Sequence, residues 1–425
     1  MRTFKQYYKN KKQNLYLEFF DAIDGAVKHI DHLEENILNK GKQGVHDALN
    51  QIEASIKYFT EESDYKISVK FDGAPAIVAG TDPSGRFFVA SKSAFAKNPK
   101  INYTVEDIER NHGHAPGLVD KLVKALKYLP SLNIKGIYQM DFMFDDQLKQ
   151  IETPQTIDGV PNENTFITFT PNTIKYAVSP DSPYGDQIQK AQIGVAVHIE
   201  YEVRDGILKV KKYTSSPDEF SSSNTVFLFN VLAGKSKQGV SRFTKRLLTD
   251  VKRKKERVLK LSNNIKFKEL EPYNALIKTY INSEIRSGRF LDNIAMSTDE
   301  LVRYNADRYQ KQIDKLKSDA GKQRKKEQMD ADMGKLMELR SSVKGVLEIT
   351  KIIAMLKNNL VKIFNEITRN DLLGNYLDEG GGQWQTTAPE GFALSKVDDE
   401  GAQITKMVDR QEFSAANFGT GKPGS

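Results

Sequence analysis

Apolar residues follow a helical spacing in the first part of the chain. Between residues 15 and 60 they recur every three or four positions, which is typical of a helix with one buried face. Gly41 and Gly44 interrupt the pattern and predict a break between two helical stretches. The clearest positions of this stripe are Val45, Leu49, Ile52, Ile56 and Phe59. We therefore predict an N-terminal helical region over residues 1–62.

The spacing changes to that of strands from residue 63 onward. Short apolar or alternating runs are separated by turn residues such as Asp82-Pro83-Ser84-Gly85 and Arg204-Asp205-Gly206. One helix with an apolar face interrupts them between Leu118 and Leu129. The predicted strands cover residues 67–71, 76–79, 87–89, 137–144, 165–170, 195–203 and 207–213. Strands thus dominate residues 63–230.

A second change in pattern occurs near residue 231. Helix-forming residues predominate up to residue 375, and the segment ends in a long amphipathic stretch from Val343 to Ile367. Short strand patterns return over residues 376–418, and the small polar residues 419–425 predict a disordered tail. The chain is therefore expected to be an α+β protein in which a helical block, residues 231–375, interrupts a strand-rich domain.

The helical block is strongly basic. Between Lys235 and Lys260 eleven Lys and Arg residues face only Asp250 and Glu256, while the whole chain has a net charge of +7. Clustered cations of this kind favour binding to nucleic-acid phosphates, with a solvated helical face or a protein-assembly surface as the alternative. The predicted nucleic-acid-binding residues are Lys245, Arg246, Lys252, Arg253, Lys254 and Lys255.

The composition of the chain indicates the cellular compartment in which the protein is expected. No apolar run approaches the ~20 residues of a membrane helix, and the basic N-terminus lacks the apolar centre of a signal peptide. The chain has no cysteine, which excludes disulfides and thiolate metal sites and suits a reducing compartment. We expect a cytoplasmic protein with no membrane partner.

The tetrapeptide Lys70-Phe71-Asp72-Gly73 lies at the end of the first predicted strand. A lysine at a strand end, beside a carboxylate and a glycine that permits close backbone approach, is suited to nucleophilic attack. A surface lysine beside a hairpin turn has the same local pattern. The interpretation therefore depends on which other residues accompany Lys70.

This tetrapeptide resembles motif I, Lys-x-Asp-Gly, of the covalent nucleotidyltransferases, which include ATP-dependent RNA and DNA ligases and capping enzymes. The resemblance continues in the family's order. Ser91-Lys92 is similar to a cation-bearing motif of some RNA ligases, and the strand Ile137–Phe144 carries Asp141 where a glutamate is commoner. Glu390-Gly391-Phe392-Ala393-Leu394 resembles motif IV, and Lys406 stands at the spacing of motif V.

The resemblance implies a mixed or antiparallel-sheet, ATP-grasp-like catalytic domain and a lysyl-AMP intermediate on Lys70. It implies that Asp72 assists catalysis and that Gly73, Lys92, Asp141, Glu390 and Lys406 surround the nucleotide. Mg²⁺, which prefers oxygen ligands, would be held by Glu390 and Asp141. The substrates implied are ATP and nucleic-acid ends, with RNA favoured over DNA.

The sequence departs from the family pattern in several places. Val408 stands where motif V has its second lysine, and Ala74-Pro75 replaces an arginine that often follows motif I. A second candidate for motifs IV and V, Gly194–Val197 with Lys209-Val210-Lys211, has the lysine pair but no glutamate. Metal binding needs an acid, so the pair containing Glu390 is preferred.

Longer stretches around Lys70, Asp141 and Val408 are also similar to an uncharacterised family of tailed-bacteriophage proteins. Two functions follow as expectations. The first is an ATP-dependent, ligase-like nucleotidyltransferase, and the second is a non-catalytic nucleic-acid-binding or virion-associated protein that keeps the fold.

Overall fold

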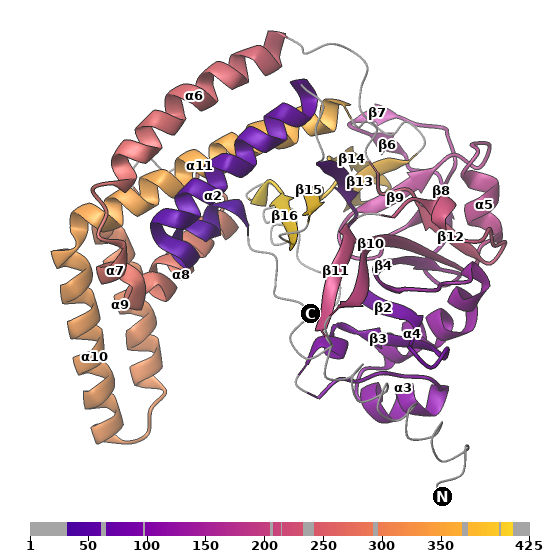
Figure 1. Ribbon diagram of the computed structural model, residues 1–425, viewed down its shortest axis with the longest axis horizontal. Helices are drawn as coiled ribbons and strands as arrows, with labels where there is room; N and C mark the ends of the chain where they lie inside the picture. The colour runs from indigo at the N-terminus through magenta and orange to yellow at the C-terminus, as the bar shows by residue number, and fades with distance from the viewer. Residues whose placement is uncertain are drawn as a thin grey trace, which may run out of the picture. The chain divides into compact units, whose positions relative to one another are not determined.

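The computed structural model describes residues 32–60, 65–96, 98–204, 207–213, 215–232, 242–291, 296–367, 373–398 and 401–410. These residues fall into two compact units. The first unit, the strand unit, is drawn from Asp64–Gly234 and Thr368–Ile404. The second, the helical unit, is drawn from Asp31–Ser63, Lys235–Ile367 and Thr405–Ser425. The chain is α+β, as the sequence predicts (Figure 1).

A six-stranded sheet is the centre of the strand unit (Figure 1). Its order is β11-β10-β4-β2-β3, all antiparallel, and β12 pairs with β10 in parallel. Its strands are β2 (Ala76–Thr81), β3 (Phe87–Ser91), β4 (Ile137–Asp145), β10 (Ile193–Arg204), β11 (Ile207–Tyr213) and β12 (Val226–Phe229). The predicted hairpin around residues 204–207 corresponds to β10 and β11.

Two helices cover one face of this sheet. They are α3 (Val105–His112) and α4 (Pro116–Tyr128), and α4 buries Leu122 and Ala125 against side chains of the sheet such as Met140 and Phe142. The opposite face has its own smaller apolar cluster, which includes Val78, Phe88 and Tyr201. Alternate residues of β4 therefore reach different environments, as its pleat requires.

A three-stranded sheet joins distant parts of the sequence. Its order is β1-β15-β16, with β1 at Lys66–Lys70, β15 at Gly391–Asp398 and β16 at Gly401–Met407. β1 and β15 are antiparallel, and Lys70 lies opposite Gly391. The strand that carries the predicted nucleophile thus pairs with a strand that lies more than 300 residues later in the sequence.

The remaining strands form a seven-stranded sheet, in which only the β14–β6 pair is parallel. Its order is β5 (Gln150–Glu152), β8 (Phe166–Phe169), β9 (Lys175–Val178), β13 (Gly374–Gly380), β14 (Gln383–Thr386), β6 (Thr156–Ile157) and β7 (Val160–Pro161). Of these seven strands the sequence predicted only β8. A turn at Gly380-Gly381-Gly382, all three with positive φ, joins β13 and β14.

The helical unit consists of seven described α-helices, six of them longer than ten residues. They are α2 (Asn36–Thr60), α6 (Arg242–Ser262), α7 (Phe267–Leu270), α8 (Asn274–Arg286), α9 (Thr298–Asp314), α10 (Asp319–Glu338) and α11 (Arg340–Ile367). α2 packs against α6 and α11, and its backbone is non-helical at Gly41, where the sequence predicts a break. The N-terminal helix, which the sequence treats as a separate region, therefore belongs to the same unit as the basic block.

No described helix combines the length and apolarity that crossing a membrane requires.

Candidate active site

Lys70 and Glu390 meet at the end of the paired strands β1 and β15. Lys70 is the last residue of β1, and Glu390 directly precedes β15. The Nζ atom of Lys70 contacts the Oε2 atom of Glu390. The strand register sets this contact, because Lys70 pairs with Gly391, the residue next to Glu390. Two residues singled out separately in the sequence thus form one ion pair.

The two partners differ in their access to solvent. The side chain of Lys70 is 29% exposed, whereas that of Glu390 is 8% exposed. A ligand can therefore reach the amine, while the carboxylate is held close to it at the protein surface. An accessible amine touching a carboxylate has the two groups that nucleophilic attack needs, a nucleophile and a proton acceptor.

Aromatic packing fixes the strand end that carries Lys70. The ring of Phe71 lies 5.9 Å from that of Tyr176 and 5.4 Å from that of Phe229, measured between centroids. Phe169 stacks on Tyr176 with ring centroids 5.5 Å apart. Phe71 is buried, so the alternation along the strand places Lys70 toward the surface.

Asp72 is buried and fully engaged in hydrogen bonds. Its carboxylate accepts from the side chain of Asn172 at 2.8 Å and from the backbone N–H groups of Thr173 at 2.8 Å and Ile174 at 3.0 Å. Its own backbone N–H donates to the hydroxyl of Tyr176 at 2.7 Å. These bonds attach the loop after Lys70 to the start of β9, so the geometry gives Asp72 a positioning role.

Asp72→Asn is expected to destabilise the strand unit by about 1–3 kcal/mol, since an amide has one acceptor oxygen and leaves buried N–H donors without partners. Thermal unfolding followed by circular dichroism measures the effect. Asp146→Asn is the matched control, because Asp146 is an exposed acid paired at the surface with Lys149, and it should change little. An unfolding midpoint unchanged by Asp72→Asn would contradict the positioning role.

Gly73 permits close packing of the loop onto β4. A Cβ atom at this position would lie 2.6 Å from the Cβ of Asp141 and 2.8 Å from the Sδ of Met143. The next residue, Ala74, donates its N–H to the carbonyl of Phe142 at 3.0 Å. The glycine of the Lys-x-Asp-Gly pattern is thus explained by the absence of space for a side chain.

Gly73→Ala should therefore cost about 1–3 kcal/mol of stability through overpacking. Chemical denaturation of the variant checks the value. Gly117→Ala is a matched control in the same unit, since a Cβ there meets nothing within 4 Å, and we expect no loss of stability. Equal stability of the two variants would show that the loop moves freely off β4.

Asp141 and Lys92 lie at the same end of the six-stranded sheet. Asp141 pairs with Ala76 of β2, and the next residue of β2, Ile77, pairs with Ser91 of β3. Lys92 directly follows Ser91 and is exposed. The sheet register therefore places two further predicted site residues, Asp141 and Lys92, at one end of the sheet.

His198 is a site residue that the sequence did not reveal. It lies at a bulge in β10, and its Nε2 atom is 3.0 Å from the Oδ2 of Asp141, although not in the direction of a hydrogen bond. The only signal in the sequence was a single histidine within an apolar strand, which predicts nothing by itself. Only the pairing of β10 with β4 places it beside an acid.

Tyr176 is close enough to three acids of the site for their charges to act on it. Burial raises the pKa of Tyr176 well above its usual value, and the negative charges of Asp72, Glu390 and Asp141 add to this effect. The hydroxyl is thus kept neutral and remains a hydrogen-bond partner for the loop. Tyr176 also escaped sequence analysis, because an aromatic residue in a short strand carries no distinguishing pattern.

The described residues contain no group of three or more His, Asp or Glu side chains placed to hold a metal ion. This finding leaves room for Mg²⁺, which is often bound through one or two protein carboxylates plus water and substrate phosphates. The oxygens of Asp72 are occupied by N–H donors. The assignment of Mg²⁺ to Glu390 and Asp141 stays a prediction from the sequence.

The two candidates for motif V occupy different places. Lys406 lies near the end of β16 and forms a bridge with His32 in the helical unit. In the alternative pair, Lys211 of β11 is in an ion pair with Glu200, and the hydrogen bond from that pair raises the pKa of Lys211. The side chain of Lys209 lies outside the described residues. Neither lysine is brought to Lys70 by a described contact.

Several predicted nucleic-acid-binding cations of α6 are already paired with acids. Arg253 and Lys254 both contact Asp250, at 2.9 and 2.7 Å, and Lys255 contacts Glu53 of α2 at 2.6 Å. Arg246 and Lys252 are exposed, and the side chain of Lys245 lies outside the described residues. Part of the charge of α6 thus holds the helical unit together.

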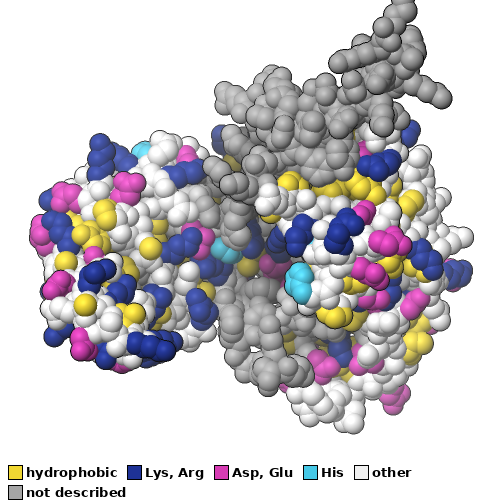
Figure 2. Space-filling view, turned by 90° about the horizontal axis from the view of Figure 1, so that it is seen from below, with side chains coloured by type: hydrophobic (Ala, Val, Ile, Leu, Met, Phe, Trp, Pro, Cys, Tyr) yellow, Lys and Arg dark blue, Asp and Glu magenta, His cyan; other side chains and the backbone are white. Residues whose placement is uncertain are grey.

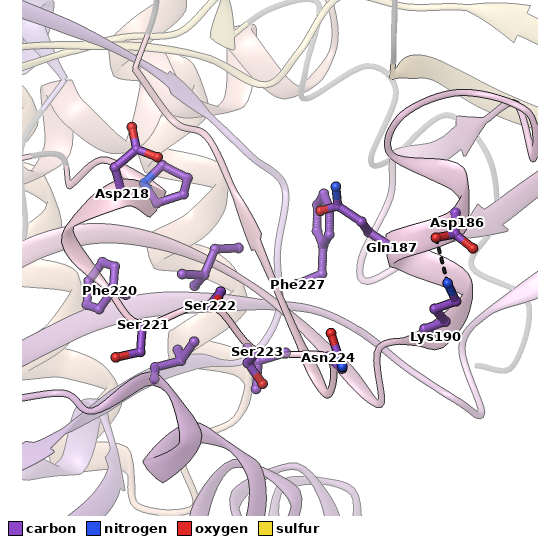
Figure 3. A pocket seen from close by; sticks show the side chains of 14 residues that line it. Asp186, Gln187, Lys190, Asp218, Phe220, Ser221, Ser222, Ser223, Asn224 and Phe227 are labelled. Atoms are coloured by element: carbon purple, nitrogen blue, oxygen red, sulfur yellow. Dashed lines mark hydrogen bonds and ion pairs between the residues drawn. The ribbon is translucent and has the colours of Figure 1, made fainter.

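A cavity of about 340 Å³ lies elsewhere in the strand unit (Figure 3). It is lined by Lys190, Asp186, Asp218 and the polar stretch 221–224, and Lys190 is paired with Asp186 at 2.7 Å. None of the residues that surround Lys70 lines it. The candidate active site is therefore the surface around the Lys70–Glu390 pair and not this cavity.

Fold and site together define an α+β protein with a partly exposed lysine paired to an acid at a strand end. The chain belongs to a family of unknown function, DUF6267, whose model matches residues 27–422. No curated protein and no solved structure matches the chain.

Proposed function

We propose that the protein is an ATP-dependent, ligase-like nucleotidyltransferase that forms a lysyl-AMP intermediate on Lys70 and acts on nucleic-acid ends. The observation that carries this proposal is the contact between Lys70 and Glu390, which lie 320 residues apart. Each residue belongs to a separate segment that resembles a nucleotidyltransferase motif. Their meeting at one strand end is what a shared catalytic role requires.

The proposed step is a displacement at phosphorus. The neutral amine of Lys70 attacks the α-phosphorus of ATP, an N–P bond forms, and the bond from that phosphorus to the oxygen bridging to the β-phosphate breaks. Pyrophosphate leaves, and the amine gives up its proton. Glu390, which touches Nζ, is the described group best placed to accept it.

Other residues of the strand unit would bind and orient the nucleotide. Lys92 is an exposed cation suited to a phosphate. Glu390 and Asp141 would hold Mg²⁺, which when bound offsets negative charge on the phosphates. Asp72 and Gly73 keep the Lys70 loop seated on β4 and β9, and this rigidity fixes the direction of attack.

The acceptor proposed is a nucleic-acid end, with RNA favoured over DNA. The basic composition of the helical unit supports this choice, because cations bind the phosphate chain without regard to base sequence. The absence of cysteine supports a cytoplasmic setting as part of this proposal.

Transfer of label from ATP tests the proposal. Protein incubated with Mg²⁺ and ATP labelled at the α-phosphate should yield a labelled band that survives denaturation, whereas label at the γ-phosphate should not transfer. The bond should be labile to acid and stable to alkali, as a phosphoramidate is. Absence of labelling, after pyrophosphate is removed and any bound AMP is discharged, would overturn the proposal.

A second candidate is a non-catalytic nucleic-acid-binding or virion-associated protein that retains the fold. One observation favours it: Val408 replaces the second lysine of motif V. Under this alternative the Lys70–Glu390 pair is a structural ion pair that joins β1 to β15. The labelling experiment separates the two candidates.

A further inference from the structure

The helices α9 and α10 form an antiparallel hairpin whose far end is unusually basic. We call residues 311–327 the hairpin tip. It contains seven Lys and Arg residues against three Asp and Glu. The cations are Lys311, Lys315, Lys317, Lys322, Arg324, Lys325 and Lys326. The excess of four positive charges is confined to the last turn of α9, the connecting loop and the first turns of α10.

These cations make no ion pair with any residue that the structure describes. Two of the three acids in the hairpin tip are bonded to amides instead: Gln310 donates to Asp314 at 2.8 Å, and Gln323 donates to Glu327 at 2.9 Å. Lys325 donates to Gln328 and lies 4.7 Å from the centre of the Tyr309 ring. The charge of the hairpin tip is therefore not neutralised within the described fold.

The hairpin tip is also open to solvent. Of residues 311–327 only Ile313 is buried, and Lys311, Lys315, Lys317, Arg324 and Lys326 are exposed. α10 has 20 residues and is about 30 Å long, and within the helical unit the hairpin runs away from α11 (Figure 1). In the space-filling view, Lys and Arg side chains stand out on the face of the helical unit that is seen (Figure 2).

The cations of α6 differ from those of the hairpin tip in their ion pairing. α6 has a comparable number of cations, but Arg253, Lys254 and Lys255 have acidic partners within the helical unit. Arg257 likewise contacts Glu348 of α11. Cations that already have carboxylate partners gain less from a phosphate than cations without them, because the existing pair must be given up.

We propose that the hairpin tip binds the phosphate backbone of a nucleic acid. Its cations lie on two adjacent helices and the loop between them, so they present several charges to a chain of phosphates at once. Such contacts supply affinity without base sequence preference and weaken as salt rises. This inference deepens the proposed function by naming the surface that holds the nucleic acid, and it rests on that function only for the identity of the partner.

The test compares two full-length variants that each lose four positive charges. The tip variant carries Lys315→Gln, Lys317→Gln, Arg324→Gln and Lys326→Gln. The control variant carries Lys66→Gln, Lys127→Gln, Lys135→Gln and Lys190→Gln, which are four exposed lysines of the strand unit. Circular dichroism and thermal unfolding establish that both remain folded.

Binding is measured by fluorescence anisotropy with labelled duplex DNA of about 30 base pairs and with single-stranded RNA of about 30 nucleotides, between about 50 and about 200 mM KCl. The tip variant should bind at least roughly tenfold more weakly, with a salt dependence shallower by roughly 2 to 4 in log–log slope. The control variant should stay within about threefold of the wild type. The two probes distinguish DNA from RNA as the source of the phosphate chain.

Three results would overturn the inference: a tip variant that binds as the wild type does, a control variant that loses as much, or a wild-type protein that binds neither probe. The last result would favour an acidic protein as the partner. The tip variant should still label itself from ATP, because its changes lie outside the strand unit. Lys70→Ala should lose labelling and keep nucleic-acid binding, whereas the tip variant should keep labelling and lose nucleic-acid binding. These two readouts keep the two proposals distinguishable.

Discussion

Lys70→Ala is expected to abolish labelling from ATP, because it removes the proposed nucleophile, the amine that contacts Glu390. Lys70→Arg should abolish it as well. Arginine keeps the positive charge and the ion pair with Glu390, but its guanidinium stays protonated and offers no free amine. Loss of label in both variants would therefore separate nucleophilic attack from simple charge neutralisation. The measurement is the fraction of protein labelled after denaturation.

The matched control for Lys70 is Lys66→Ala. Lys66 begins the same strand, β1, is exposed, and pairs in the backbone register with Ser395. Its loss should leave labelling unchanged. Labelling that persists in Lys70→Ala, or that disappears in Lys66→Ala, would refute the assignment of the nucleophile.

Glu390→Gln tests the partner of Lys70. The amide keeps the shape of the carboxylate but accepts no proton and offers no charge to a metal ion. We expect labelling to slow by about 100-fold or more, the usual effect of losing a general acid–base group. Thermal stability should change less than activity, because Gln can still accept a hydrogen bond from Lys70. A large loss of stability with full labelling would instead favour a structural ion pair.

The largest expected effect on stability is in the helical unit, at Lys357. This lysine of α11 and Glu34 are each 1% exposed, and Nζ lies 2.9 and 2.8 Å from the two carboxylate oxygens. Burial alone would raise the pKa of Glu34, but the charges of Lys357 and Arg410 bring it below its usual value. The carboxylate is thus kept charged inside the unit by its two cations.

Lys357→Met should therefore destabilise the protein by about 3–5 kcal/mol, because it leaves a buried charge with too little compensation. Adding Glu34→Gln should recover most of this loss, since the double variant no longer buries an unmatched carboxylate. Denaturant unfolding of the wild type and the single and double variants gives the coupling energy. Equal destabilisation in the single and double variants would show that methionine simply packs badly at this position.

The same pair predicts a dependence of stability on pH. A carboxyl whose pKa is lowered by folding stabilises the folded state above its unfolded pKa, and this contribution is lost as the pH falls through the folded value. Asp145 behaves in the same way: burial alone would raise its pKa, but hydrogen bonds from Lys121 and Lys124 bring it to about 2. Stability should therefore fall progressively as the pH drops from the ordinary range of carboxyl titration toward the lowered folded-state values, as acid unfolding followed by circular dichroism would measure.

Part of the order of helices and strands could be predicted from the sequence alone. The spacing of apolar residues predicted α2 with its break at Gly41, the strands β4 and β8, and the hairpin of β10 and β11. These elements were accessible because each buries one face, and burial imposes a period on the sequence within the element. The short strands β13 and β14 were missed, since four to seven residues of mixed polarity carry little periodicity.

The tertiary structure alone decided which residues meet. That Glu390 contacts Lys70 follows from the antiparallel register of β1 and β15, and local periodicity contains no information on pairing between segments this far apart. His198, Tyr176 and Asn172 escaped prediction for the same reason. Lys357 gave a weak signal, a lysine on the apolar stripe between Ile353 and Leu360, but its partner Glu34 did not.

The positions of charged residues could be read from the sequence, but their ion pairs could not. The sequence showed where cations cluster, and both α6 and the hairpin tip are rich in Lys and Arg. Whether a cation remains available depends on acids from other helices, such as Glu53 and Glu348, which come close only on folding. Local sequence therefore determined the elements and their net charge. Long-range packing, which brings together residues with no regular spacing, determined the candidate site and the surface open to a partner.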